Sequence, residues 1–109
     1  MNVVEEYTII NSDTDVEFRY FYRLIKKDYK GATAYGIEIE RKDYVDLRNI
    51  NLERERIDMI SIHRHKATQL LIKLYNNVVS PLHLIDIAGS YADEHAYEFD
   101  AVTCEKVIN

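Results

Sequence analysis

Apolar and polar side chains alternate along residues 16–24, a stretch that is rich in aromatic residues. Alternation with a period of two is typical of a β-strand with one buried and one exposed face. We therefore predict a strand at about residues 16–26. Its inward face would carry Val16, Phe18, Tyr20, Tyr22 and Leu24, and its outward face Glu17, Arg19, Phe21 and Arg23.

Three further stretches have strand-like patterns. Residues 33–42 alternate in the same way, with Tyr35, Ile37 and Ile39 on one side. Residues 3–10 and 56–62 are shorter runs that we also predict to be strands. Polar residues 11–15 would close the first turn and residues 26–31 the second, because Asn, Asp and Gly favour turn conformations.

The period changes after residue 62. Apolar residues at helical spacing, from Ala67 to Val78, predict an amphipathic helix at about residues 63–77, with Ser61 as a candidate N-cap. Ser80 followed by Pro81 is a start signal for a second helix, because proline at the first helical position needs no hydrogen-bond donor. We extend this helix to about residue 95, through Gly89, since the apolar stripe resumes after the glycine.

A run of strands followed by a run of helices indicates an α+β fold. We predict a single domain over residues 1–109, with an antiparallel meander of about four strands and two helices packed on one face of the sheet. Residues 97–109 would form a last short strand or a tail. The other face of the sheet would have no covering layer.

Composition limits the class of protein. The chain has 109 residues, of which 47% are apolar and 30% charged, so it can form one hydrophobic core and is not a disordered segment. Its single cysteine, Cys104, excludes an internal disulfide framework. It has no basic and apolar leader and no run long enough to cross a membrane, so we expect a cytoplasmic protein.

The open sheet face leads to the first functional hypothesis. An uncovered sheet face tends to dimerise or to recruit a partner. We therefore predict a non-enzymatic interaction or regulatory domain that binds another protein or itself. The contact surface would centre on Arg19, Phe21, Arg23 and Ile25.

The distribution of charge keeps a nucleic-acid-binding alternative open. The net charge is -5, but residues 18–73 carry an excess of Lys and Arg, whereas both flanking segments are acidic. Nucleic acids attract basic residues through their phosphates. A module of this class would use residues 19–30 and 41–66, although the acidic total argues against it.

Two clusters are candidate small sites. His63, Arg64, His65 and Lys66 lie at the predicted start of the first helix, where they could contact an anion. His83 and Asp86 are three residues apart on the second helix and, with Asp93, could form a polar ligand or enzyme site. Neither cluster has the ligand spacing of a metal site, and we predict no metal, no cofactor and no catalytic residue.

Three short stretches resemble a family of small uncharacterised bacterial proteins, a domain of unknown function. They are Tyr35-Gly36-Ile37 within a strand, Ile60-Ser61 before a leucine-rich helix, and Ser80-Pro81-Leu82-His83-Leu84 at the start of the second helix. The resemblance covers roughly residues 18–93. It implies a bacterial, cytoplasmic protein and brings no established activity, substrate or cofactor.

Overall fold

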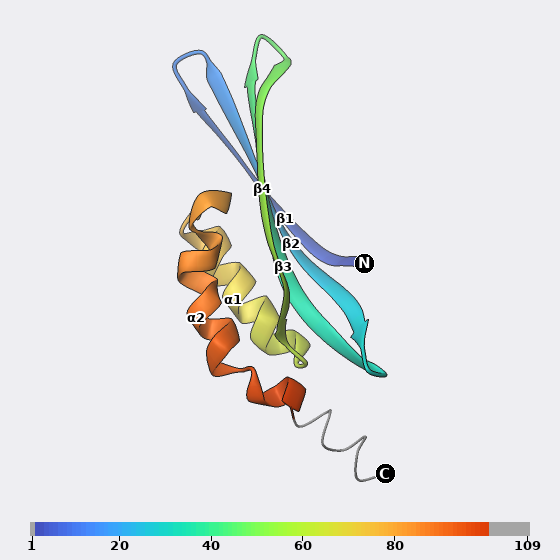
Figure 1. Cartoon of the computed structure of the whole chain (residues 1–109). Coiled ribbons are helices and arrows are strands. Elements are labelled where there is room, and N and C mark those ends of the chain that lie inside the picture. The colour runs from blue at the N-terminus through green and yellow to red at the C-terminus, as the bar shows by residue number, and fades with distance from the viewer. Residues whose placement is uncertain (1, 101–109) are drawn as a thin grey trace.

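The computed structural model describes residues 2–100 and has four antiparallel strands followed by two helices (Figure 1). The strands pair in chain order, β1-β2-β3-β4, so the sheet is the predicted meander. A short 3₁₀ helix, η1, leads directly into the second helix. The elements are β1 (Asn2–Asp13), β2 (Val16–Tyr29), β3 (Ala32–Val45), β4 (Arg48–Ser61), α1 (Arg64–Asn76), η1 (Pro81–His83) and α2 (Leu84–Glu94).

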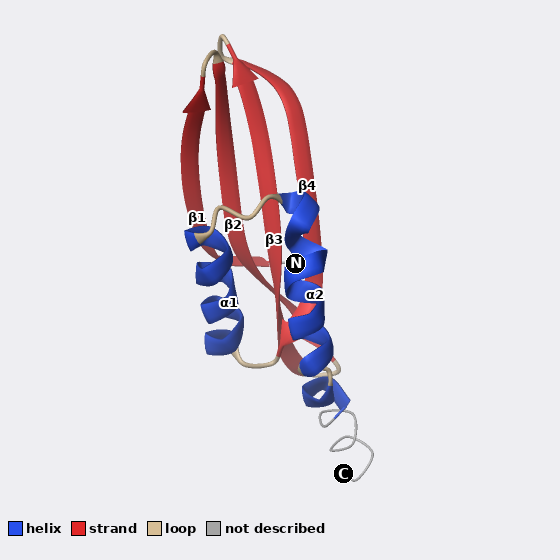
Figure 2. Cartoon of the chain, turned by 90° about the vertical axis from the view of Figure 1, so that its left-hand side faces the viewer, coloured by secondary structure: helices blue, strands red, loops and turns tan. Residues whose placement is uncertain are grey.

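Both helices lie on one face of the sheet, as predicted (Figure 2). Helix α1 packs mainly against β2 and β3, and α2 packs against β4. The buried core lies between these layers. It comprises Tyr22, Leu24, Ile37, Ile39 and Ile60 from the strands, and Ala67, Leu70, Leu71, Leu74, Leu84 and Ala88 from the helices.

The strands reach well beyond the helices, as Figure 2 shows. This makes the molecule elongated, with extents of 59 × 22 × 18 Å. In the half of the sheet that carries the β1–β2 and β3–β4 turns, neither face is covered by a helix of the described chain. The exposed Leu47 and Ile50 lie at the β3–β4 end of this half.

The strands are longer than the sequence pattern predicts. β2 continues to Tyr29, so most of the predicted turn at 26–31 is strand, and β4 begins at Arg48 instead of residue 56. The turn between β3 and β4 consists of Asp46 and Leu47, both with positive φ. Such turns normally use Asn or Gly, which adopt this conformation at low cost. Aspartate tolerates positive φ but leucine rarely adopts it, so Asp46-Leu47 is only a weak turn signal in the sequence.

Gly36 allows β3 and β4 to approach closely where their pairing is irregular. The register shifts between Tyr35 and Ile37, opposite residues 57–61 of β4. A Cβ atom at position 36 would lie 2.2 Å from the carbonyl oxygen of Ile57 and 2.4 Å from that of Asp58. Only glycine fits this position without displacing the β4 backbone.

The start of α1 differs from the prediction. His63 is the N-cap residue and makes no side-chain cap hydrogen bond, whereas Ser61 was the predicted cap. The Ser61 hydroxyl instead accepts a hydrogen bond from the His63 amide (2.9 Å) and donates one to Glu98 (2.6 Å). Ser61 thus links the end of β4 to the C-terminal part of the chain.

Residues 97–100 are helical, so the predicted strand or tail at 97–109 is wrong over its first part. The buried Glu98 carboxylate fixes this turn, since it also accepts hydrogen bonds from the Ile62 amide (3.0 Å) and the Lys66 ammonium (2.9 Å). Burial alone would raise the pKa of Glu98, but these bonds and the one from Ser61 lower it to about 2. Residues 101–109, which include Cys104, lie outside the described part of the chain.

Tyr22 connects the sheet to the loop that joins the helices. Its ring is fully buried in the core, and its hydroxyl donates a hydrogen bond to the Val79 carbonyl oxygen (2.9 Å). Burial raises the pKa of Tyr22, so this hydroxyl stays protonated and remains a donor. Among the described helices, none is long and apolar enough to span a bilayer.

Candidate functional site

The sheet face opposite the helices, which we call the open face, is the candidate binding surface. In antiparallel pairing, directly opposed residues project to the same face. The register therefore assigns three successive outward positions from each strand to the open face. These are Glu6, Thr8 and Ile10 of β1; Arg19, Phe21 and Arg23 of β2; Glu38, Glu40 and Lys42 of β3; and Leu52, Arg54 and Arg56 of β4.

Arg23 is the centre of an ion-pair network on this face. Its guanidinium bonds to Glu6 at 2.6 Å, to Glu38 at 2.8 Å and to Glu40 at 3.1 Å, so it joins three strands. Burial alone would lower the pKa of Arg23, but these three hydrogen bonds raise it above its ordinary value. The guanidinium is therefore held in one orientation as a permanent cation.

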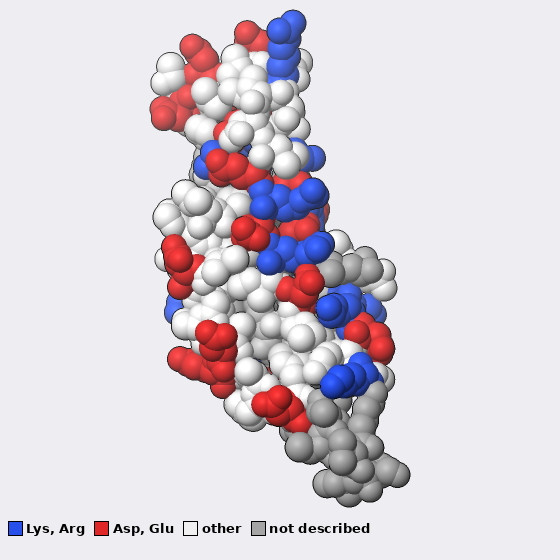
Figure 3. Space-filling model, viewed as in Figure 1, with Lys and Arg blue, Asp and Glu red and all other residues white. Residues whose placement is uncertain are grey.

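The network continues from β3 to the edge strand β4. Glu40 is almost fully buried, and it also pairs with Lys42 (3.8 Å) and Arg54 (3.5 Å). Glu38 pairs in turn with Arg56 (3.8 Å). Figure 3, which views the molecule with β4 towards the reader, shows charged side chains of both signs alternating down the middle of the molecule.

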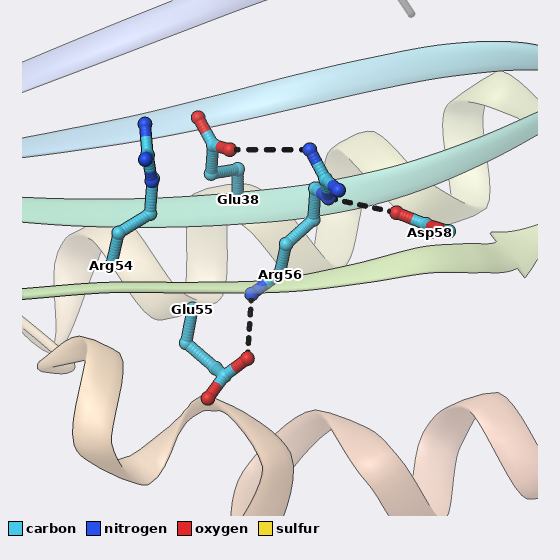
Figure 4. Close-up of a pocket in the computed structure, with 5 residues that line it drawn as sticks. All are labelled: Glu38, Arg54, Glu55, Arg56 and Asp58. Atoms are coloured by element: carbon cyan, nitrogen blue, oxygen red, sulfur yellow. Dashed lines mark hydrogen bonds and ion pairs between the residues drawn. The ribbon is translucent and has the colours of Figure 1, made fainter.

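A shallow hollow of about 460 Å³ lies at the β4 end of the network (Figure 4). Arg54, Arg56 and Glu38 project to one side, whereas Glu55 points the other way. Arg56 also bonds to Asp58 at 2.8 Å. The side chains of Arg54 and Arg56 are 55% and 46% exposed, so both guanidinium groups remain accessible to a bound molecule.

Aromatic rings lie among these charges. Phe21 lies beneath two cations, with the Arg23 guanidinium 5.2 Å and the Lys42 ammonium 5.3 Å from the ring centroid. Arg19 lies 4.3 Å from the ring centroid of Tyr44 and pairs with Glu17 at 2.6 Å. Such cation–π contacts orient the basic side chains flat against the sheet.

The structure brings Arg19, Phe21 and Arg23 together on the open face, but Ile25 is only 2% exposed. Ile25 pairs with Gly36, beside which the β4 carbonyl groups occupy the space that a side chain would fill. Ile25 therefore cannot contribute to a contact surface. The pattern of one strand predicts which face a residue takes, but it cannot predict how closely the next strands approach.

Sequence reasoning missed the acidic half of the site, namely Glu6, Glu38 and Glu40. Their positions on outward strand faces were a usable signal, because the alternation in residues 33–42 already placed Glu38 and Glu40 away from the core. Their pairing with Arg23 depends on the register between strands, which the sequence of one strand does not contain.

The basic cluster at the start of α1 lies together on the surface. His63, Arg64 and His65 are exposed and line a second hollow, with the two imidazole rings 5.7 Å apart. The two stronger cations are already paired, Arg64 with Glu5 at 3.2 Å and Lys66 with Glu98 at 2.9 Å. An anion at this position would compete with these carboxylates.

His83, Asp86 and Asp93 are all exposed. His83 ends η1, whereas Asp86 and Asp93 lie on α2. None of the three lines the hollows described above. Over residues 2–100, no group of three or more His, Cys, Asp or Glu side chains has the arrangement of a metal site.

Most basic side chains of the segment 18–73 are paired with carboxylates inside the molecule. Arg41, for example, bonds to Asp43 at 3.0 Å and lies 3.4 Å from Glu53. The basic members of these pairs are Arg19, Arg23, Lys27, Arg41, Lys42, Arg54, Arg56, Arg64 and Lys66. The basic middle segment is thus neutralised largely by neighbouring acids and is not a continuous positive surface.

Comparison with models of protein families matches residues 1–94 to a family of unknown function, DUF6514. The match includes all four strands and both helices. No curated protein and no solved structure matches the chain.

Proposed function

The chain belongs to the DUF6514 family, a family of unknown function, and we propose that it is a non-enzymatic protein-binding module whose binding surface is the open face. The observation that carries this proposal is the arrangement of Arg19, Phe21 and Arg23 on a sheet face that no helix of the described chain covers. The helices supply the core on the other side, so the open face is not needed to bury the core.

The chemistry of the open face favours a protein partner. Bases and acids alternate across the four strands, so the surface has no large field of one sign. A protein whose charges are opposite in sign to these, position by position, would be preferred over other proteins, because like-charge contacts are costly. The half-exposed Ile10 and Leu52 flank the network on the two edge strands and would supply apolar contact area.

Nucleic-acid binding has less support. Phosphate contacts need cationic side chains, and most of those in residues 18–73 already bond to carboxylates. A ligand site at His83 and Asp86 gains no support from the two hollows described above, since neither residue lines them. We further propose that the module acts in the bacterial cytoplasm, in keeping with a sequence that has one cysteine.

The experiment compares two double variants of the tagged full-length chain, expressed in the cells that normally produce it. Arg54→Gln with Arg56→Gln removes two accessible charges from the open face while keeping polar side chains there. Lys26→Gln with Lys73→Gln removes the same charge from exposed positions outside that face.

We expect the open-face variant to lose proteins that co-purify with the wild type, and the control variant to keep them. Both variants should unfold within about 1 kcal/mol of the wild type, because Arg54 and Arg56 are about half exposed and Arg23 still pairs with Glu38 and Glu40 when they are replaced. Equal recovery of the same proteins by all three chains would contradict the proposal.

A further inference from the structure

The two edge strands of the sheet differ in how they are protected from pairing with another strand. β4 carries charged side chains of both signs along residues 53–58 and has α2 and η1 packed against it. β1 has twelve residues and contains no Lys, Arg or Pro; its charges are those of Glu5, Glu6 and Asp13, and a register shift against β2 lies near its start, between Val3 and Glu5. Lysine and proline, two of the usual means by which an exposed edge avoids further pairing, are therefore missing from β1. Every second residue of β1 directs its backbone N–H and C=O away from β2, so this edge can accept another strand.

Partly exposed apolar side chains follow the same edge on the helix side. Val4, Tyr7 and Ile9 of β1 are only partly buried and form the margin of the core. Helix α1 adds Tyr75, whose ring lies 5.4 Å from that of Tyr7, and Ile72, which is 38% exposed. Ile72 lies on the same flank of α1 as Tyr75, three residues away. A strand added to β1 would cover this apolar strip.

We propose that a second copy of this chain occupies the β1 edge, with the two β1 strands antiparallel about a two-fold axis at Thr8. The result is a continuous eight-stranded sheet with all four helices on one side. A two-fold contact of this kind uses the same surface twice, so the apolar strip of each copy meets that of the other.

The positions of the charges favour this register and this occupant. With Thr8 at the axis, residues 5–11 of each β1, which pair with β2 in regular register, are matched, and Tyr7 lies opposite Ile9 of the second copy. Glu6 lies opposite Ile10 and Glu5 opposite Asn11, so no carboxylate of this stretch faces another. Aromatic and aliphatic side chains in directly opposed positions stabilise strand pairing. The sequence of β1 therefore matches itself over residues 5–11, the regular central part of the strand.

The first test measures the mass of the full-length chain by analytical ultracentrifugation over a range of micromolar concentrations. The wild type should have twice the chain mass of 12.9 kDa. Thr8→Lys places two like charges at the axis and should weaken the dimer about tenfold or more. Thr33→Lys, the same change at an exposed position of β3, should leave the dimer unchanged.

Two results would overturn the proposal. One is a wild-type chain that remains at 12.9 kDa up to millimolar concentration. The other is equal weakening of the dimer by Thr8→Lys and Thr33→Lys, which would place the contact elsewhere.

The second test examines the register in a Cys104→Ser background. Thr8→Cys places two thiols directly opposite each other, within reach of a disulfide after mild oxidation. Ser12→Cys lies four residues from the axis, so the two thiols are separated by about 27 Å along the strands. We expect a covalent dimer from Thr8→Cys only. Covalent dimers from both variants, or from neither, would contradict the register.

The dimer and the proposed partner-binding role are tested separately. Arg54→Gln with Arg56→Gln lies on the far edge strand and should leave the dimer mass unchanged while it reduces partner recovery. Loss of the dimer in this double variant would show that the copies meet through the open face, which would overturn the assignment to β1.

Discussion

Replacing Gly36 with alanine should strongly destabilise the protein, because the added Cβ has no space. It would lie 2.2 Å and 2.4 Å from two backbone carbonyl oxygens of β4, whereas carbon and oxygen normally approach to about 3.3 Å. One strand must therefore move by about 1 Å. Over-packing of this kind costs about 1–3 kcal/mol, and each ladder hydrogen bond that is broken adds about 1 kcal/mol. We expect a loss of about 2–4 kcal/mol in the free energy of unfolding.

Gly89 provides the matched control, since the same substitution there should have the opposite sign. It lies inside α2, where the atom nearest to an added Cβ is an Ile85 methyl group at 3.7 Å, an ordinary contact. Alanine is favoured over glycine in a helix interior, so Gly89→Ala should stabilise the protein by about 0.5–1 kcal/mol.

Urea denaturation followed by far-UV circular dichroism measures both changes. A Gly36→Ala variant as stable as the wild type would refute the close approach of β3 and β4. Equal destabilisation by the two variants would also refute it, because the effect would then not depend on the local packing.

Three further predictions concern other parts of the structure. Glu98→Gln should lower the free energy of unfolding by about 2–3 kcal/mol at pH 7. Measured by urea denaturation, this difference between variant and wild type should shrink as the pH falls from about 4.5 towards about 2. The reason is that a lowered pKa in the folded state stabilises the protein only while the carboxylate is ionised; a difference that does not change with pH would contradict this. Arg23→Met leaves the nearly buried Glu38 and Glu40 without the cation that they share, and should lower the free energy of unfolding by about 2–4 kcal/mol. A melting temperature equal to that of the wild type would show that the network does not stabilise the fold. Leu47→Gly should increase the free energy of unfolding by about 1 kcal/mol and so raise the melting temperature slightly, because Leu47 has φ 66° and the residue is 90% exposed. A lower melting temperature would contradict this, since it would mean that the Leu47 side chain packs in solution.

Local periodicity predicted the class of fold and the order of its elements. The alternation in β2 and β3 correctly placed Tyr22, Leu24, Ile37 and Ile39 in the core beneath the helices. The helical spacing from Ala67 to Leu74 identified the buried face of α1. These patterns record the burial of one face, which each segment contains in its own sequence.

Features that depend on contacts between distant segments could not be predicted. The long hairpin of β3 and β4 turns at Asp46 and Leu47, and leucine ordinarily avoids the positive φ that it has here. Glu98 reaches Ser61 across 37 positions of the chain, so the sequence near Glu98 gives no sign of its burial. The same reason explains why Arg19, Phe21 and Arg23 were found without the carboxylates that fix them.

The most direct measurement of the central claim is site-specific photo-crosslinking from the open face in the cells that produce the protein. A benzophenone amino acid replaces Phe21 in one chain and Gln69, which is exposed on α1, in another. The proposed function predicts a discrete protein adduct from position 21 that disappears when Arg54→Gln and Arg56→Gln are added, and no such adduct from position 69. Adducts from position 69 alone, or the same adducts from both positions, would contradict it.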